Sequence, residues 1–166
     1  MLVSPQRYHR GRSPRRPRKQ RDFQVCWANV GRSSPNHITA LQLAFDKKID
    51  VICIQELSTY AQSRTSTHPG YTHYSPVNTW DHENDSTRPR VMTYVLKTRT
   101  LNVKQGEPTG SRDLLWLHVE RYAILNVYRQ PQTPEVLEYI THLSPPSNCL
   151  IGGDFNARHC EGIWAE

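Results

Sequence analysis

Residues 149–156 read Cys-Leu-Ile-Gly-Gly-Asp-Phe-Asn, and no other stretch of the 166-residue chain says more about its fold. An apolar run of strand length passes into two glycines and then presents Asp154 and Asn156. In an extended chain, residues two apart point to the same side, so we expect these side chains to face one ligand while Phe155 turns back into the core. The glycines let the strand end bend and let another backbone or a ligand come close. A carboxylate and an amide in one cleft suit the binding of a phosphate or a water.

An earlier part of the chain predicts a strand, a helix and a second strand. Residues 23–29 form an apolar run that ends in Asn29, and residues 50–56 form another that ends in Gln55 and Glu56. This order, within about 35 residues, predicts two neighbouring parallel strands and a right-handed crossover. Because the carboxyl ends of parallel strands meet at one edge of a sheet, Asn29 and Glu56 should belong to one site.

The helix between these strands is expected to begin at Ser34, which can cap it, with Pro35 in the first turn. Lys47 and Lys48 are expected to close its last turn. The apolar face is predicted to comprise Ile38, Leu41, Leu43, Ala44 and Phe45.

The middle of the chain reads as loops and hairpins. Residues 57–90 are polar and rich in turn residues, and we expect a loop around a short strand near 71–75. Further strands are predicted at 91–96, 101–104, 114–119 and 122–127. Short linkers at 106–108 and 120–121 indicate antiparallel hairpins. A helix over 134–143 leads into the final strand.

The formal net charge of +6 is unevenly distributed. Residues 1–21 hold eight basic and no acidic side chains, whereas the remainder holds thirteen basic and fifteen acidic ones, which gives +8 and −2. The first segment is also rich in proline, and we expect it to be disordered. It reads either as a nuclear-import or polyanion-binding tail or as a leader without function. The residues expected to bind nucleic acid are Arg15, Arg16, Arg18, Lys19 and Arg21.

The four cysteines show neither the spacing of a zinc site nor the density of a disulfide scaffold. Three of them, Cys26, Cys53 and Cys149, lie in apolar runs. We therefore interpret them as small buried hydrophobic residues in a reducing compartment.

Four strand ends carry polar groups in order along the chain. The four motifs are Trp27-Ala28-Asn29-Val30, Cys53-Ile54-Gln55-Glu56, Asn126-Val127-Tyr128-Arg129-Gln130-Pro131 and Gly152-Gly153-Asp154-Phe155-Asn156-Ala157. In this order they resemble the endonuclease/exonuclease/phosphatase superfamily, and most closely the endonuclease domain of LINE-type non-LTR retrotransposons. Residues 88–95 also look like the middle strand of that branch. The resemblance begins near residue 23 and covers only the front part of the family's domain.

The resemblance implies a fold and a set of site residues. The fold is a four-layered α/β sandwich of the α+β kind, with two mainly antiparallel sheets face to face and helices outside. Glu56 matches the family's ligand for a divalent metal, usually Mg²⁺ (or Mn²⁺), and Asn29 matches the asparagine beside the metal. Tyr128 matches the tyrosine that bonds the scissile phosphate. Asp154 matches the carboxylate that positions or deprotonates the attacking water, and Asn156 matches its amide partner, which donates to a phosphate oxygen.

Together these groups imply in-line hydrolysis of a phosphodiester, with metal and amide donors stabilising the extra negative charge. The chemistry of Glu56 agrees, because Mg²⁺ prefers oxygen ligands and is often bound by one or two carboxylates plus substrate phosphate. Structural roles also fit: Glu56 as a surface carboxylate, Tyr128 as a half-buried sheet residue, and Asn29 or Asn156 as a turn former.

The family ends with further strands, an aspartate and a Ser-Asp-His word, and nothing after Asn156 supplies them. Losing one general acid or base costs about 10² to 10⁴ in rate, so we expect activity to be impaired or absent. The predicted organisation is a tail over 1–21 and a superfamily domain over 22–166 that is truncated after the Asp-Phe-Asn motif. We expect marginal stability, because inner faces and a sheet edge would be exposed.

Three functions are open at this point. The leading hypothesis is a magnesium-dependent DNA endonuclease, a hydrolase derived from a retrotransposon and originally fused to a reverse transcriptase, with RNA as the other candidate substrate. The second is a non-catalytic nucleic-acid-binding remnant that acts through its basic tail. The third is another phosphoesterase of the superfamily, such as an abasic-site nuclease or a small-molecule phosphatase. No run approaches the roughly 20 apolar residues of a membrane span, and no secretory signal is present, so we expect an intracellular, nuclear protein without membrane partners.

Overall fold

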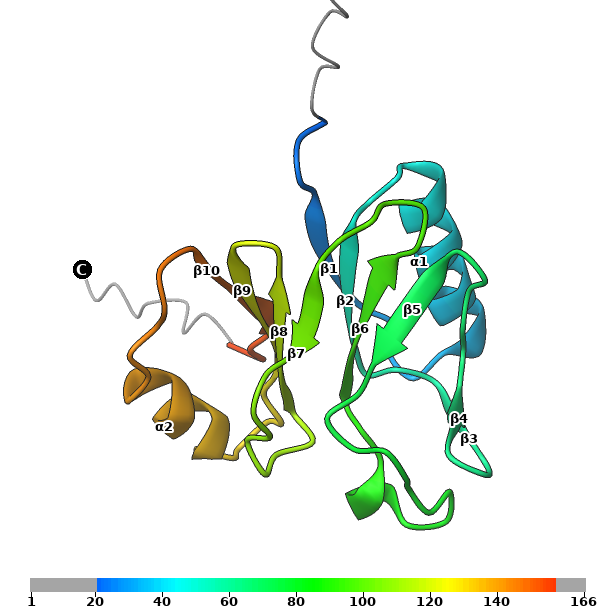
Figure 1. The fold of residues 1–166 in the computed structure, drawn as a ribbon. Coiled ribbons are helices and arrows are strands. Elements are labelled where there is room, and N and C mark those ends of the chain that lie inside the picture. Colours follow the sequence, from blue (N-terminus) through cyan, green and yellow to red (C-terminus); the bar gives the residue numbers. More distant parts are fainter. Residues whose placement is uncertain (1–20, 158–166) are drawn as a thin grey trace, which may run out of the picture.

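Two four-stranded sheets pack face to face, and one helix lies on the outer side of each (Figure 1). The computed structural model describes residues 21–157. The layers follow one another as helix α2, second sheet, first sheet and helix α1, which is the mixed α/β sandwich predicted from the sequence.

The first sheet contains the two parallel strands expected near the N-terminal end. Its strand order is β1 (Val25–Asn29), β2 (Val51–Gln55), β6 (Val91–Leu96) and β5 (Tyr71–Tyr74). Helix α1 (Ser34–Asp46) joins β1 to β2, and these strands run parallel as predicted. Strand β6 is antiparallel to both of its neighbours.

The second sheet is built from the C-terminal half. Its order is β10 (Cys149–Asp154), β9 (Tyr122–Tyr128), β8 (Leu114–Val119) and β7 (Val103–Gln105). The two predicted hairpins are confirmed, because β8 pairs antiparallel with both β7 and β9. Helix α2 (Glu135–Thr141) carries the chain back so that β10 runs parallel to β9.

Helix α1 departs from its prediction in its cap and in its buried face. Ser33, not Ser34, is the N-cap, and its hydroxyl accepts a hydrogen bond from Asn36 N. Ile38 and Leu43 were expected on the apolar face but are 54% and 53% exposed. His37 is fully buried on this helix, and its Nε2 lies 3.0 Å from the Tyr94 hydroxyl of strand β6, so the buried ring has a hydrogen-bond partner.

The segment between β2 and β6 has more regular structure than its composition predicts. The short strand near residue 71 is confirmed as β5, but a small hairpin of β3 (Thr59–Tyr60) and β4 (Arg64–Thr65) precedes it. A turn of 3-10 helix, η1 (Asp85–Thr87), follows it. Strands of two residues are too short to show an alternating pattern, which explains why the sequence reads as loop there.

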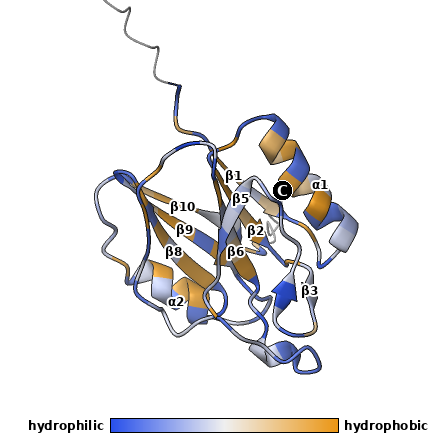
Figure 2. Ribbon diagram, turned by 45° about the vertical axis from the view of Figure 1, so that its right-hand side comes forward, coloured by the Kyte–Doolittle hydropathy of each residue, from blue (hydrophilic) through white to orange (hydrophobic). Residues whose placement is uncertain are grey.

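The core between the sheets is formed by apolar side chains from both. Figure 2 shows the long strands of the two four-stranded sheets as mostly hydrophobic, whereas β3 and much of the connecting chain are hydrophilic. The buried members of this cluster are Val51, Cys53, Val95, Leu117, Val119 and Ile124. Trp27 and Leu150, on β1 and β10, pack against it while half-buried.

A group of polar contacts around Asn126 lies inside this apolar layer. Gln55 Nε2 donates to Asn126 Oδ1 at 2.6 Å, and both residues are buried. The Asn126 amide nitrogen is close to three acceptors on the first sheet, Ile54 O, Met92 O and Thr93 Oγ1, at 3.2, 3.0 and 3.3 Å. These hydrogen bonds link the two sheets to each other within the apolar layer.

The paired glycines of β10 are required by close contacts. A Cβ atom on Gly153, where φ is +147°, would lie 1.8 Å from Val127 O. A Cβ atom on Gly152 would lie 2.5 Å from the Trp27 ring. The predicted close approach of another backbone is therefore confirmed.

The described cysteines agree with the small-hydrophobe interpretation only in part. Cys53 is fully buried, and burial raises the pKa of its thiol to about 12, whereas Cys26 and Cys149 are half-buried. All three carry free thiols. Among residues 21–157, the helices are too short and too polar to cross a membrane.

Candidate functional site

Two hydrogen bonds join the sheets at the edge where β1, β2, β9 and β10 end. Tyr128 Oη donates to Glu56 Oε1 at 2.7 Å, and Asn29 Nδ2 donates to Asp154 Oδ2 at 2.5 Å. Each bond links one residue of the first sheet or its exit to one residue of the second. The structure thus brings together four of the five residues that the sequence assigns to catalysis and metal binding.

Strand register places the two bonded pairs beside each other. Asp154 and Tyr128 are partners in the parallel pairing of β10 with β9. Asn29 is the partner of Gln55, and Glu56 follows directly after it. The four side chains therefore form one cluster in which neighbours are linked by pairing within a sheet and by hydrogen bonds between the sheets.

Glu56 leaves the sheet in a constrained backbone conformation. Its φ is +47°, in the left-handed region that side chains other than glycine seldom adopt. The conformation is held by Glu56 N, which donates to Arg90 O at 2.9 Å, and by Glu56 O, which accepts from Arg32 N at 2.6 Å. Such a backbone outlier, held by its neighbours, is frequent at functional sites.

The Asn156 side chain does not point in parallel with that of Asp154. Asn156 has φ +44°, and its amide nitrogen donates to Arg129 O at 2.7 Å. Its backbone N–H donates to Asp154 Oδ1 at 2.8 Å. The chain turns at this point, so the extended geometry assumed from the sequence is wrong here. Phe155 packs against the apolar core residues Leu114, Leu125, Val127 and Val136, as predicted.

Asn29 contributes both ends of its amide to the site. Its Oδ1 accepts from Gly31 N at 2.8 Å, while its Nδ2 is bonded to Asp154. The bond fixes the orientation of Asn29 with its donor toward the carboxylate. In this structure Asn29 therefore orients Asp154.

Arg90 is a site residue to which the sequence assigned no role. Its guanidinium lies over the Tyr128 ring, 5.6 Å from the centroid, and its Nε lies 3.0 Å from Asp113 Oδ1. A terminal nitrogen also donates to Gln130 Oε1. The Arg90 side chain is only 11% exposed, so its charge acts on Tyr128 through little water. The sequence did contain a signal for this role, because Arg90 directly precedes a buried strand. A charged side chain next to buried residues requires a partner.

The electrostatics keep the Tyr128 hydroxyl protonated. Burial and the hydrogen bond to Glu56 raise the pKa of Tyr128 to about 12, while Arg90 and Arg32 lower it to a smaller extent. Burial also raises the pKa of Asp113, and Arg90 opposes that effect. Tyr128 is therefore a hydrogen-bond donor throughout the neutral pH range.

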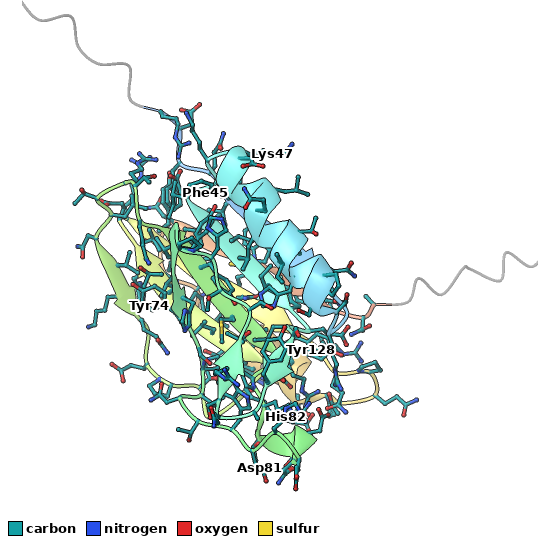
Figure 3. The ribbon with its side chains drawn as sticks, turned by 90° about the vertical axis from the view of Figure 1, so that its right-hand side faces the viewer. Phe45, Lys47, Tyr74, Asp81, His82 and Tyr128 are labelled. Carbon is teal, nitrogen blue, oxygen red and sulfur yellow. The ribbon has the colours of Figure 1, made fainter. Side chains whose placement is uncertain are left out.

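Two hollows lie beside Glu56 and Arg90. A cavity of about 70 Å³ next to Glu56 is bordered by Arg32, Asp85 and Arg88. An open cleft of about 600 Å³ begins at Arg90 and extends along residues 109–114 toward α2. Figure 3 labels Tyr128, Asp81 and His82 near this end of the molecule and Lys47 at the other.

Most of the basic segment lies outside the described residues, including Arg15, Arg16, Arg18 and Lys19. Arg21 is described, and its guanidinium forms an ion pair with the fully buried Asp50 carboxylate. Arg99 binds the other oxygen of Asp50 at 3.0 Å. Arg21 is thus attached to the folded domain at the end remote from Glu56.

Comparison with known proteins supports the fold. No protein-family model and no curated protein matches the chain. Among solved structures, the endonuclease domain of TRAS1, a telomere-specific non-LTR retrotransposon, matches with a TM-score of 0.63 and 18% sequence identity. The chain has the fold of a retrotransposon endonuclease domain. The match covers 82% of this chain and 60% of that domain, so the chain spans about three fifths of its length.

The structure places two carboxylates, those of Glu56 and Asp154, in this cluster at the edge of the sheets. No group of three or more His, Cys, Asp or Glu residues that would enclose a metal occurs within residues 21–157. This arrangement suits Mg²⁺, which keeps several waters and often takes only one or two carboxylates.

Proposed function

We propose that this chain is a metal-dependent phosphodiesterase of the DNA endonuclease kind, related to those of non-LTR retrotransposons. The observation that carries the proposal is the pair of hydrogen bonds, Tyr128 to Glu56 and Asn29 to Asp154, at one edge of the sandwich. They gather two carboxylates, a phenol and an amide around one small volume. Such groups can bind a divalent metal and donate hydrogen bonds to a phosphate, which are two requirements of phosphodiester hydrolysis.

In this proposal Glu56 holds Mg²⁺ or Mn²⁺, which when bound neutralises charge on the phosphate. The Asn29 amide has a second N–H that donates to a phosphate oxygen. The Tyr128 hydroxyl, whose one proton is donated to Glu56 in the free protein, turns to donate to a phosphate oxygen when substrate binds. Asp154 is the carboxylate that orients the attacking water and accepts its proton. Its position is fixed by donors from Asn29 and from the Asn156 backbone. A positioned general base typically contributes 10² to 10⁴ in rate.

We also propose that residues 1–21 form a basic tail and residues 22–166 the endonuclease-like domain. In this proposal the protein is nuclear, and the domain was originally fused to a reverse transcriptase.

The test is nicking of supercoiled plasmid by the purified chain with Mg²⁺, with Mn²⁺ and with EDTA. Wild-type protein should convert plasmid to the open circle only with a metal, and Glu56→Ala and Asp154→Ala should each remove this activity. Glu107→Ala is a matched control, because Glu107 is exposed on the loop between β7 and β8. Nicking that survives both site substitutions would exclude the assigned roles.

The second candidate is nucleic-acid binding without hydrolysis, carried by the basic tail. It rests on the eight basic and no acidic residues within 1–21. Binding that weakens steeply with salt and is lost when residues 1–20 are removed, with no metal-dependent nicking, would select it.

A further inference from the structure

Asp85 occupies a position between two arginines beside the site. Its Oδ1 lies 3.3 Å from Arg32 Nη1 and 3.7 Å from Arg88 Nη1, so one carboxylate oxygen faces both guanidinium groups. Arg32 comes from the loop between β1 and α1, and Arg88 lies just after η1. These three side chains and Glu56 border the same small cavity.

Among the described residues, Asp85 is the carboxylate that Arg32 and Arg88 contact. Glu56 borders the same cavity but is hydrogen-bonded to Tyr128. The other nearby arginines have their own partners. Arg90 pairs with Asp113, while Arg112 donates to the backbone oxygens of Asp85 and Arg88. Arg32 and Arg88 are therefore the two arginines that another anion could bind if it displaced Asp85.

The ion pair itself is weakly held. The Asp85 side chain is 60% exposed and that of Arg32 is 54% exposed. Ion pairs between exposed groups contribute little, because water solvates the separated charges nearly as well. Asp85 also sits on a single turn of 3-10 helix in a polar loop, so its departure would disturb no apolar contact of its own.

We propose that Arg32 and Arg88 form a subsite for a backbone phosphate of the nucleic-acid strand, adjacent to the phosphate at Glu56, and that Asp85 occupies this subsite in the free protein. The inference rests on the proposed function, since the phosphate belongs to that substrate. A phosphodiester has two oxygens that share a negative charge. A guanidinium group can donate hydrogen bonds to both of them at once, which a lysine ammonium cannot do with the same geometry. Asp85 thus competes with the strand for the same two arginines.

The experiment measures binding of the full chain to a fluorescein-labelled 20-base-pair DNA duplex by fluorescence anisotropy, in EDTA and from 50 to 200 mM salt. Asp85→Asn removes the competing charge and should tighten binding about three- to tenfold at the lowest salt. It should also steepen the dependence of log K on log salt by roughly 0.9 for each additional phosphate that the protein neutralises. Arg32→Gln in the Asp85→Asn background should abolish the tightening.

Asp81→Asn is the matched control. Asp81 is an exposed aspartate four residues earlier on the same loop, and its Oδ1 accepts from Glu83 N (Figure 3). The substitution makes the same change in net charge but leaves the arginine pair occupied. Equal tightening by Asp81→Asn and Asp85→Asn, or no tightening by either, would overturn the subsite.

This result is independent of the hydrolysis assay, because EDTA prevents metal-dependent cleavage. Tightening specific to Asp85→Asn supports the subsite even when the plasmid is not nicked. Metal-dependent nicking with no specific effect of Asp85→Asn leaves the proposed function in place and rejects the subsite.

Discussion

Tyr128 Oη lies 2.7 Å from Glu56 Oε1, and this hydrogen bond joins the end of β9 in the second sheet to the exit of β2 in the first. The two residues are separated by 72 positions in sequence. Arg90 is placed to hold the ring, because its guanidinium lies over the ring face and is itself paired with Asp113. The proposed metal ligand and phosphate donor are therefore positioned by one connected set of side chains.

We predict that Tyr128→Phe lowers metal-dependent nicking about 10²-fold, because the donor to the phosphate is lost while the ring remains. The free energy of unfolding should change by only about 1 kcal/mol, the typical contribution of one hydrogen bond. Plasmid nicking and urea denaturation measure the two effects. Tyr122→Phe is the control, since Tyr122 lies at the start of the same strand. Equal nicking by Tyr128→Phe and wild-type protein would contradict the role of the hydroxyl.

We predict that Asn126, which has no assigned role in catalysis, contributes to the stability of the fold. Asn126→Ala leaves Gln55 without its buried acceptor and should lower the free energy of unfolding by about 2–3 kcal/mol. Asn102→Ala, at an exposed position, should change it by about 0.5 kcal/mol or less. Urea denaturation of both variants tests this, and similar midpoints for the two would show that the buried amide contacts contribute little.

The sequence motifs at the strand ends predicted the positions of four of the clustered side chains, because each motif follows a local pattern. An apolar run followed by a polar residue places Asn29, Glu56 and Tyr128 at strand ends, and the paired glycines mark β10. The contacts of Arg90 with Asp113 could not be predicted in this way. Those residues are distant in sequence and meet only after the sheets have packed. Local patterns also fail where a polar residue takes an apolar position, as His37 does on α1.

The choice between Ser33 and Ser34 as the helix cap has a similar cause. Both have the preferred side chain, and only the backbone decides which hydroxyl reaches Asn36 N. The turn at Asn156 is another example, because its left-handed φ depends on the bond to Arg129 O from the neighbouring strand. Tertiary contacts therefore set the details that the sequence left open.

Gly153 predicts a large steric effect. Gly153→Ala would place a methyl group 1.8 Å from Val127 O, and the backbones of β9 and β10 would have to separate. We expect the variant to lose cooperative unfolding and to accumulate in the insoluble fraction. Gly110→Ala is the matched control, because Gly110 also has a positive φ, of +75°, but has open space around its Cβ position. It should cost only about 1–2 kcal/mol from the backbone conformation. A soluble Gly153→Ala protein that unfolds at the wild-type urea midpoint would contradict the close packing of β9 and β10.

His37 predicts how stability depends on pH. Burial lowers the pKa of its imidazole from 6.5 to about 4, and its two nitrogens lie 3.3 Å from Ser58 N and 3.0 Å from Tyr94 Oη. Because the unfolded chain binds a proton near pH 6.5 and the folded chain does not, unfolding takes up a proton between these values. The contribution of neutral His37 to the free energy of unfolding is fully present above pH 6.5. It is lost as the pH falls toward 4, by about 3 kcal/mol in total.

Urea denaturation at pH 7.5, 6, 5 and 4.5 measures this loss. His37→Gln should be less stable than wild type at pH 7.5 but should lose less stability on acidification, because glutamine does not titrate. His73 shifts in the same direction through burial and the nearby Lys97, so it remains in both proteins as a common background. His118→Gln, at an exposed position, should follow the wild-type pH dependence. Identical slopes for wild type and His37→Gln would assign the acid sensitivity to other groups.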